Sequence, residues 1–254
     1  MSETETQRAE RLSRLSRALK NQTLAPRPPG EPPSSEHKSG ISAELIDAPS
    51  RSALQTVVQS ARVSYLSEGD QGERDWKLAS YLARHNHTSP FRHAYFTFRV
   101  TAPIFIMRQI MKHQIGCSWN ERSGRYTQFD ESEHWKPRQW RTQDRRKQAT
   151  SVEADRDTAN RAQAIYDRSM GESWTAYREL IDLGIGREQA RAVLPQSTLT
   201  SAYLTISLQA LAHLLKLREE EHSQAEAQEL AHAIRRAFEA HDPDHARLLN
   251  LLTS

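Results

Sequence analysis

A cluster of prolines near the N-terminus limits which part of this chain can fold into a domain. Five of the eleven prolines fall between Pro26 and Pro33. Proline fixes φ and has no backbone N–H to donate, and the Ser, Glu and Lys residues around it offer nothing to bury. The stretch therefore predicts an extended linker. We expect an N-terminal extension over residues 1–40 and a globular domain over residues 41–254.

The segment ahead of the prolines has a short helical pattern. Leu12, Leu15 and Leu19 recur at helical spacing among arginines, which predicts an amphipathic arm. A mobile extension and an arm that docks on a partner subunit both fit this pattern. The first residues include no apolar run of the kind that begins a secretory signal, so we expect a cytoplasmic protein.

Composition excludes several classes of protein. Lys plus Arg total 35 against 32 for Asp plus Glu, a net charge of +3, which is too small an excess to coat a nucleic acid. No apolar stretch approaches the roughly 20 residues that cross a bilayer, so we expect no membrane partner. The single cysteine, Cys117, excludes an internal disulfide and a multi-cysteine zinc site.

Periodicity indicates the α+β class. Ala94, Phe96, Phe98 and Val100 alternate with polar or amphipathic residues, which predicts a half-buried strand. The segment 197–206 fits a strand or a continuing helix, and we favour the strand. Helical patterns cover 75–84, 103–112, 152–182, 208–218 and 223–240.

One segment departs from core-building patterns. Residues 108–126 read RQIMKHQIGCSWNERSGRY, and the part from Gly116 to Gly124 is too polar and broken for a helix, so we expect a loop. Serine and glycine beside arginine suit close approach to a phosphate, with charge-assisted hydrogen bonds to hold it. A solvated charged loop is the alternative interpretation.

Other polar residues have two interpretations each. His85, His87 and His93 invite a zinc interpretation, but no recognised ligand spacing completes it, so we expect no metal site. Two pairs, Arg187 with Arg191 and Arg218 with His222, are spaced to share a helical face. Each arginine could hold an anionic ligand or pair with a surface carboxylate.

The lone cysteine could be a nucleophile or a small buried residue. A thiolate can add to an electrophilic ring carbon. Nothing in the sequence around Cys117 indicates a lowered pKa, and a single cysteine is more often an apolar core residue. We favour the structural interpretation.

Six segments together match a family in order: ARVSY at 61–65, HTSPFRHAYFTF at 87–98, APIFIMRQ at 102–109, NERSGRY at 120–126, ARAVLP at 190–195 and LKLREEEHSQAEAQ at 215–228. Over residues 45–245 the chain resembles the flavin-dependent thymidylate synthases. The resemblance implies an α+β fold with a central mixed or antiparallel sheet flanked by helices. It also implies a homotetramer in which several subunits build each active site.

The family's chemistry is implied in the same way. Its members transfer the one-carbon unit of 5,10-methylenetetrahydrofolate to C5 of dUMP, while NADPH reduces a bound FAD that supplies the hydride. They need no cysteine nucleophile. We therefore expect a methyltransferase that acts on a uridine monophosphate, either dUMP or UMP.

The resemblance assigns roles to individual residues. Those expected to bind the nucleotide are Gln109, Glu121, Ser123, Gly124, Arg125, Arg191 and Arg218. Two of them are expected to be catalytic: Ser123, the signature serine near the reacting base, and Arg218, which faces the pyrimidine. Those expected on the flavin side are Ser64, His87, Ser89, Lys112, His113, Gln114, Ser207, His213 and His222.

The chain departs from the family signature of Arg-His-Arg, seven residues and then serine. Lys112 and Gln114 replace the two arginines, and eight residues separate Gln114 from Ser123. Lysine keeps the charge but loses the planar fork, and glutamine loses the charge, so the grip on FAD is expected to differ. A non-catalytic flavin- or nucleotide-binding homologue and a C5-hydroxymethylating enzyme remain the alternative interpretations.

Overall fold

The computed structural model describes residues 39–63, 72–144 and 151–253. The chain divides into two units, Met1–His37 and Lys38–Ser254, and the described residues all belong to the second. The predicted arm and proline-rich linker lie outside the described residues except at their last two positions, and so does Ser64.

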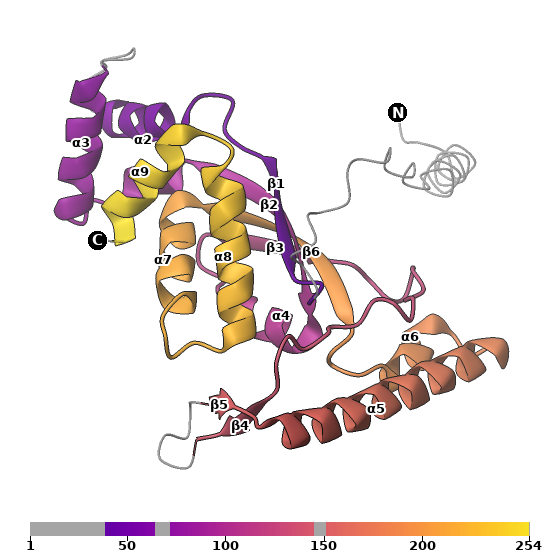
Figure 1. The fold of residues 1–254 in the computed structure, drawn as a ribbon. Coiled ribbons are helices and arrows are strands. Elements are labelled where there is room, and N and C mark those ends of the chain that lie inside the picture. Colours follow the sequence, from indigo (N-terminus) through magenta and orange to yellow (C-terminus); the bar gives the residue numbers. More distant parts are fainter. Residues whose placement is uncertain (1–38, 64–71, 145–150, 254) are drawn as a thin grey trace, which may run out of the picture. The chain divides into compact units, whose positions relative to one another are not determined.

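The elements in chain order are β1 (Ser42–Asp47), α2 (Ala53–Arg62), α3 (Glu73–Arg84), the 3₁₀ turn η2 (Ser89–Arg92), β2 (Tyr95–Pro103), α4 (Ile104–Ile110), β3 (Cys117–Glu121), β4 (Arg141–Gln143), β5 (Ser151–Glu153), α5 (Arg156–Asp182), α6 (Arg187–Ala190), the 3₁₀ turn η3 (Arg191–Val193), β6 (Leu199–Ser207), α7 (Leu208–Arg218), α8 (Ala225–Glu239) and α9 (Pro243–Thr253). Figure 1 shows their arrangement.

Four strands form an antiparallel sheet in the order β1-β2-β6-β3. The central strands β2 and β6 pair along nine residues, from Tyr95 opposite Ser207 to Pro103 opposite Leu199. Both predicted strands are confirmed, and the segment 197–206 is a strand rather than a continuing helix. The α+β class is confirmed, with the sheet antiparallel throughout.

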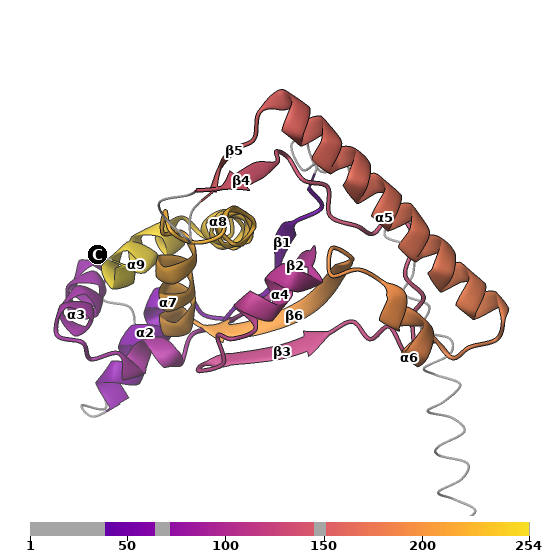
Figure 2. The same ribbon diagram turned by 90° about the horizontal axis from the view of Figure 1, so that it is seen from below.

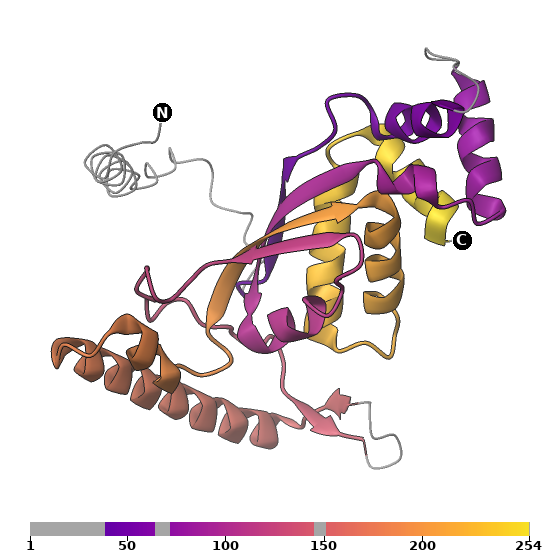
Figure 3. The same ribbon diagram turned by 180° about the vertical axis from the view of Figure 1, so that it is seen from behind.

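The two faces of the sheet differ in polarity. Phe96, Phe98 and Val100 are fully buried on the face covered by α7 and α8, which Figures 1 and 2 show on one side of the sheet. The opposite face carries hydroxyl pairs, such as Thr97 with Thr205 at 2.9 Å. In Figure 3, no helix of the described chain lies across β6 and β3 on this polar side.

The expected loop between Gly116 and Gly124 is wrong in part, because Cys117–Glu121 forms the edge strand β3. Its backbone pairs with β6 from Cys117 opposite Ile206 to Glu121 opposite Ala202. Ser118 and Asn120 lie opposite Thr205 and Tyr203 on the polar face of the sheet, where both side chains are exposed. Polarity therefore concealed a strand that tertiary pairing stabilises.

The prediction that two residue pairs each share a helical face is also wrong. The helix α6 ends at Ala190, and Arg191 begins the 3₁₀ turn η3, so Arg187 and Arg191 do not share one α-helical face. The helix α7 ends at Arg218, ahead of Glu219, Glu220 and Glu221. Arg218 and His222 therefore do not share one α-helical face.

The remaining helix predictions hold with shifted ends. Predicted helix 152–182 begins at Arg156, because Asp155 caps the backbone N–H groups of Asp157 and Thr158 and residues 151–153 form β5.

A second apolar cluster joins α5 and α6 to the loop after β3; its members are Phe129, Met170, Trp174, Tyr177 and Ala190. Within the described part of the chain, no helix is both long and apolar enough to cross a membrane.

Candidate active site

The predicted catalytic arginine lies at the centre of a hydrogen-bonded cluster at the end of α7. Arg218 donates from Nε to Nε2 of His113 at 3.0 Å and from its terminal nitrogen to the backbone oxygen of Gln109 at 3.5 Å. Trp119 in turn donates from its indole nitrogen to the backbone oxygen of His113 at 3.1 Å. The structure thus brings together three predicted residues, Gln109, His113 and Arg218, from two elements that are distant in sequence.

The cluster controls the charge of His113. Partial burial, the Arg218 guanidinium and the nearby His213 lower the pKa of His113 from 6.5 to about 4. The imidazole is therefore neutral at pH 7, which leaves Nε2 able to accept the Arg218 hydrogen bond. His213 lies on the exposed side of α7, with its ring centroid 6.1 Å from that of His113.

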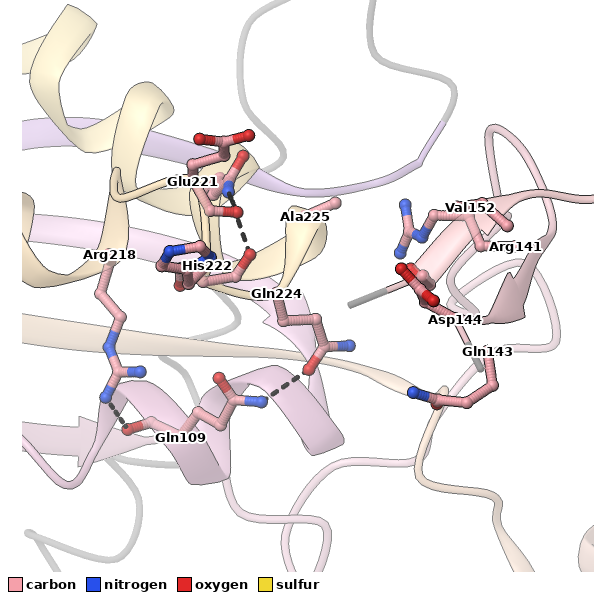
Figure 4. Close-up of a pocket in the computed structure, with 13 residues that line it drawn as sticks. Gln109, Arg141, Gln143, Asp144, Val152, Arg218, Glu221, His222, Gln224 and Ala225 are labelled. Atoms are coloured by element: carbon pink, nitrogen blue, oxygen red, sulfur yellow. Dashed lines mark hydrogen bonds between the residues drawn. The ribbon is translucent and has the colours of Figure 1, made fainter. Parts of the chain in front are cut away.

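A pocket of about 790 Å³ adjoins this cluster. Figure 4 shows Gln109, Arg218 and His222 on one side and Arg141, Gln143 and Asp144 on the other. Val152 and Ala225 are the apolar residues that line it among mostly polar side chains, so its walls suit a polar ligand. Sequence reasoning missed Arg141 and Gln143, which come from β4 and lie outside every matched motif, and it passed over Gln224 within the last motif.

The NERSGRY segment forms a tight turn directly after β3. The backbone oxygen of Ser123 accepts from the N–H groups of Tyr126 at 3.0 Å and Thr127 at 3.2 Å. Arg125 is exposed, and its guanidinium lies 5.2 Å from the centre of the Tyr126 ring. Before the turn, Glu121 accepts a hydrogen bond from the Thr200 hydroxyl at 2.9 Å.

Gly124 brings this turn against the predicted phosphate-binding arginine. A Cβ atom at Gly124 would lie 2.6 Å from Cε2 of Phe129 and 3.1 Å from Cδ of Arg191. The absence of a side chain is therefore what allows Arg191 to pack beside the turn. The structure thus joins a second set of predicted residues: Glu121, Ser123, Gly124, Arg125 and Arg191.

Predicted flavin-side residues before β2 lie close to α7. Arg92 of η2 donates to the side chain of Gln209 on α7 at 2.6 Å and to Thr88 at 3.2 Å, which places Ser89 and His87 near that helix. His87 makes edge-on ring contacts with Tyr81 and His85, and the two imidazole centroids are 6.4 Å apart. Across the described residues, no group of three or more ligand side chains is placed to hold a metal ion.

The other flavin-side predictions differ in exposure. Lys112, Gln114 and His222 are exposed and able to meet a ligand. Ser207 is 2% exposed, and its hydroxyl accepts from the N–H of Ala210 at 3.3 Å as the N-cap of α7. Its hydroxyl thus has a structural partner already.

Cys117 lacks the lowered pKa that a nucleophilic cysteine needs. It begins β3, is half-buried, and burial raises the pKa of its thiol to about 11. A thiol is then protonated at pH 7, whereas a nucleophilic cysteine needs a thiolate. The structural interpretation of this residue agrees with its environment.

The two sets of predicted site residues lie at opposite ends of β3. Gln109 and His113, which bind Arg218, lie just before Cys117, whereas Ser123, Gly124 and Arg125 follow Glu121. Among the described residues, no hydrogen bond or ion pair joins one set to the other. One copy of the chain thus presents two half-sites rather than one closed site.

A comparison with known protein families supports what the fold, the motifs and the arginine clusters indicate. Residues 44–244 match the family described as thymidylate synthase complementing protein, and the chain belongs to this family. It is accordingly an enzyme of the methyltransferase class.

Individual relatives agree with this assignment. The chain is 41% identical over 189 residues to the flavin-dependent thymidylate synthase of Kosmotoga olearia, covering 74% of this chain and 81% of that protein. It is 34% identical to the enzyme of the same name from Streptomyces coelicolor, covering 75% and 80%. A solved UMP/dUMP methylase from Streptomyces cacaoi bound with 5-Br UMP matches with a TM-score of 0.72 and 33% identity, covering 85% of this chain and 96% of that one. A second structure of that methylase holds 5-Br dUMP.

Proposed function

We propose that this chain methylates C5 of a uridine monophosphate, dUMP or UMP, with the one-carbon unit of 5,10-methylenetetrahydrofolate and a hydride from NADPH that passes through FAD. One observation supports this most directly: Arg218, held by His113 and Gln109, borders a polar pocket in a chain that resembles a methylase solved with both bromo-nucleotides.

Arg218 is proposed to face the pyrimidine. Hydrogen bonds to His113 and to the Gln109 backbone fix its guanidinium, so a cation is already in place before charge develops on the ring. A preorganised cation of this kind stabilises negative charge on an oxygen or nitrogen of the base during reaction. The neutral state of His113 leaves Arg218 as the positive charge of this pair.

The second half-site is proposed to bind the phosphate and the sugar. Arg125, the residue after Gly124, and Arg191, which packs beside Gly124, supply guanidinium groups, and the backbone of the tight turn can approach an anion closely. Ser123, at the start of the turn, is proposed to act near the reacting base, and Glu121 to bind the nucleotide.

The flavin side is proposed to run along the exposed face of α7. Imidazole, amide and ammonium groups suit the carbonyls, hydroxyls and phosphates of FAD; the described residues concerned are His87, Ser89, Lys112, His113, Gln114, His213 and His222. Ser207 was also predicted on the flavin side. Its hydroxyl caps α7, so it stabilises the helix that carries this face. Bound flavin would supply the hydride that converts the transferred methylene unit to a methyl group.

Two half-sites at opposite ends of β3 support shared active sites. In the proposed homotetramer, the Arg218 end of one copy meets the Arg191 end of another around a single nucleotide. This arrangement gives the phosphate and the base their charged partners without requiring the two ends of one β3 to approach each other.

Tritium release from C5-labelled dUMP and UMP tests the proposal. Each nucleotide is incubated with FAD, NADPH and 5,10-methylenetetrahydrofolate, and a matched reaction omits the folate. We expect folate-dependent release from at least one nucleotide and its loss in Arg218→Ala. Release from UMP would identify a modified-nucleotide enzyme, whereas release from dUMP alone would identify a thymidylate synthase. A flavin-loaded protein that releases tritium from neither would contradict the proposal and favour a non-catalytic homologue.

A further inference from the structure

A chain of hydrogen bonds runs from a buried carboxylate to Gln109 on the pocket wall. Glu226, 6% exposed, accepts from the Arg141 guanidinium at 2.5 Å and from the side-chain nitrogen of Gln224 at 2.9 Å. The side-chain oxygen of Gln224 then accepts from Nε2 of Gln109 at 2.6 Å. Figure 4 shows this last contact between Gln109 and Gln224 across the pocket wall.

The carboxylate determines which way both amides face. An ionised carboxylate only accepts hydrogen bonds, so Gln224 must turn its NH₂ group to Glu226 and its carbonyl to Gln109. Gln109 must then turn its own NH₂ group to Gln224. Its Oε1 accepts no hydrogen bond from the described residues, and it belongs to a side chain that lines the pocket close to Arg218.

The pairing of Glu226 with Arg141 keeps this arrangement in one state. A buried carboxylate needs a charged partner to remain ionised, and Arg141 on β4 supplies it across 85 residues of sequence. The same pair attaches the first turn of α8 to the β4 strand on the far side of the pocket.

We propose that Glu226 is a positioning residue for the nucleotide: acting through Gln224, it fixes the amide of Gln109 so that the pocket wall presents an acceptor oxygen beside the Arg218 guanidinium. This inference rests on the proposed function, because the nucleotide is its ligand. Glu226 does not touch the ligand itself. Its effect is on binding rather than on the chemical step.

The substitution Glu226→Gln tests the orientation directly. The new amide keeps the volume but can donate to Gln224, which can then turn its NH₂ group toward Gln109 and reverse that amide as well. We expect KM for the nucleotide to rise about tenfold with kcat changed by less than about twofold, because a contact made equally in ground and transition states is lost.

Exchanging the two side chains provides the rescue. In Glu226→Gln combined with Gln224→Glu, the carboxylate at position 224 can only accept, so it again requires the NH₂ group of Gln109 to face it. We expect KM to return to within about threefold of wild type. A role limited to packing at position 226 or to the ion pair with Arg141 would not produce this recovery, because position 226 still carries an amide in the double variant.

Two further variants separate positioning from stability. Gln224→Ala removes an exposed side chain that makes no capping hydrogen bond to α8, so the protein should fold, and KM should rise as in Glu226→Gln. Glu219→Gln is the matched control: Glu219 also accepts from an arginine, Arg235, at 2.5 and 2.7 Å, but it does not line the pocket. Its KM should match wild type.

The outcomes distinguish this inference from the proposed function. A raised KM in Glu226→Gln and Gln224→Ala, with recovery in the exchanged variant, supports the positioning role. Unchanged KM in both single variants, or no recovery in a folded exchanged variant, overturns the positioning role and leaves the proposed function intact. A wild-type protein that neither binds nor turns over dUMP or UMP overturns both.

Discussion

Arg218 and His113 share a hydrogen bond of 3.0 Å in which the guanidinium donates and the imidazole accepts. An imidazole nitrogen can accept only when it carries no proton, so this contact requires neutral His113. The pKa lowered to about 4 meets that requirement over the neutral pH range. The two residues therefore support each other: burial, together with the Arg218 charge, keeps His113 neutral, and His113 holds Arg218 in place.

This pair predicts how stability depends on pH. The unfolded chain protonates His113 near 6.5, whereas the folded chain does so only near 4, so folding opposes protonation within that window. The stabilising contribution is complete above about pH 6.5 and falls as the pH drops toward about 4. In His113→Gln, whose amide oxygen can still accept from Arg218, the free energy of unfolding should depend less steeply on pH across this window. Urea unfolding at a series of pH values measures it.

Gln114→Ala is the control for this prediction. It alters the exposed neighbouring residue and removes no titratable group, so it should keep the wild-type slope. An identical slope in His113→Gln and wild type would contradict the lowered pKa.

A methyl group at Gly124 should displace Arg191. In Gly124→Ala the added Cβ would lie 2.6 Å from the Phe129 ring and 3.1 Å from Arg191, so both side chains must move. We expect nucleotide affinity to fall about tenfold and stability to fall by about 1–3 kcal/mol, as for other overpacked sites. Isothermal titration with dUMP and UMP, together with thermal unfolding, measures the two effects.

Gly171→Ala is the control for Gly124→Ala. A Cβ there meets nothing within 4 Å, and the residue lies inside the helix α5. The change should stabilise the protein by about 0.5–1 kcal/mol through helix propensity and leave affinity unchanged. Equal affinities for Gly124→Ala and wild type would contradict the proposed role of the Gly124–Arg191 contact.

Removal of either phosphate-side arginine should weaken nucleotide binding. Arg125→Ala and Arg191→Ala each delete a charged partner of the proposed phosphate, and hydrogen bonds to charged groups contribute about 1.5–3 kcal/mol, or about 10- to 100-fold in affinity. Both side chains are exposed, so little stability should be lost. Arg187→Ala, on the neighbouring helix α6, should bind as wild type does. Unchanged affinity in both test variants would contradict the assignment of this half-site.

The thiol should be dispensable. Cys117→Ser keeps the size of a half-buried residue whose raised pKa of about 11 leaves it protonated at pH 7. We expect tritium release at the wild-type rate to within about twofold, a difference too small for loss of a nucleophile. Loss of release in a folded, flavin-loaded variant would reinstate the cysteine as a nucleophile.

The periodic spacing of apolar residues in the sequence predicted the elements with one regularly buried face. The strand β2 has strict period-two burial, and the helix α7 has a leucine stripe, so both could be predicted. The strand β3 could not, because Cys117 and Trp119 are its only apolar side chains and its stability comes from pairing with β6, 81 to 89 residues away. The helix α2 carries a detectable signal in Leu54, Val57 and Val58 behind the Ser52 cap, and that signal was overlooked.

The candidate site was predictable only in its motif residues. Gln109, His113 and Arg218 were found through matched segments, and the structure joins them by hydrogen bonds. The contact between Arg141 and Glu226 has no local signal, because neither residue type nor spacing marks two positions 85 residues apart as partners. The wall of the pocket formed by β4 therefore emerged only from the fold.

The position of β3 between the two half-sites has a genetic consequence. If each nucleotide is held by the Arg218 end of one copy and the Arg191 end of another, a lesion at either end inactivates every site built from identical copies. Chains damaged at different ends can nevertheless complement each other. When Arg218→Ala and Arg191→Ala chains assemble together, some sites combine the intact end of each, so two impaired alleles would together restore activity that neither supplies alone.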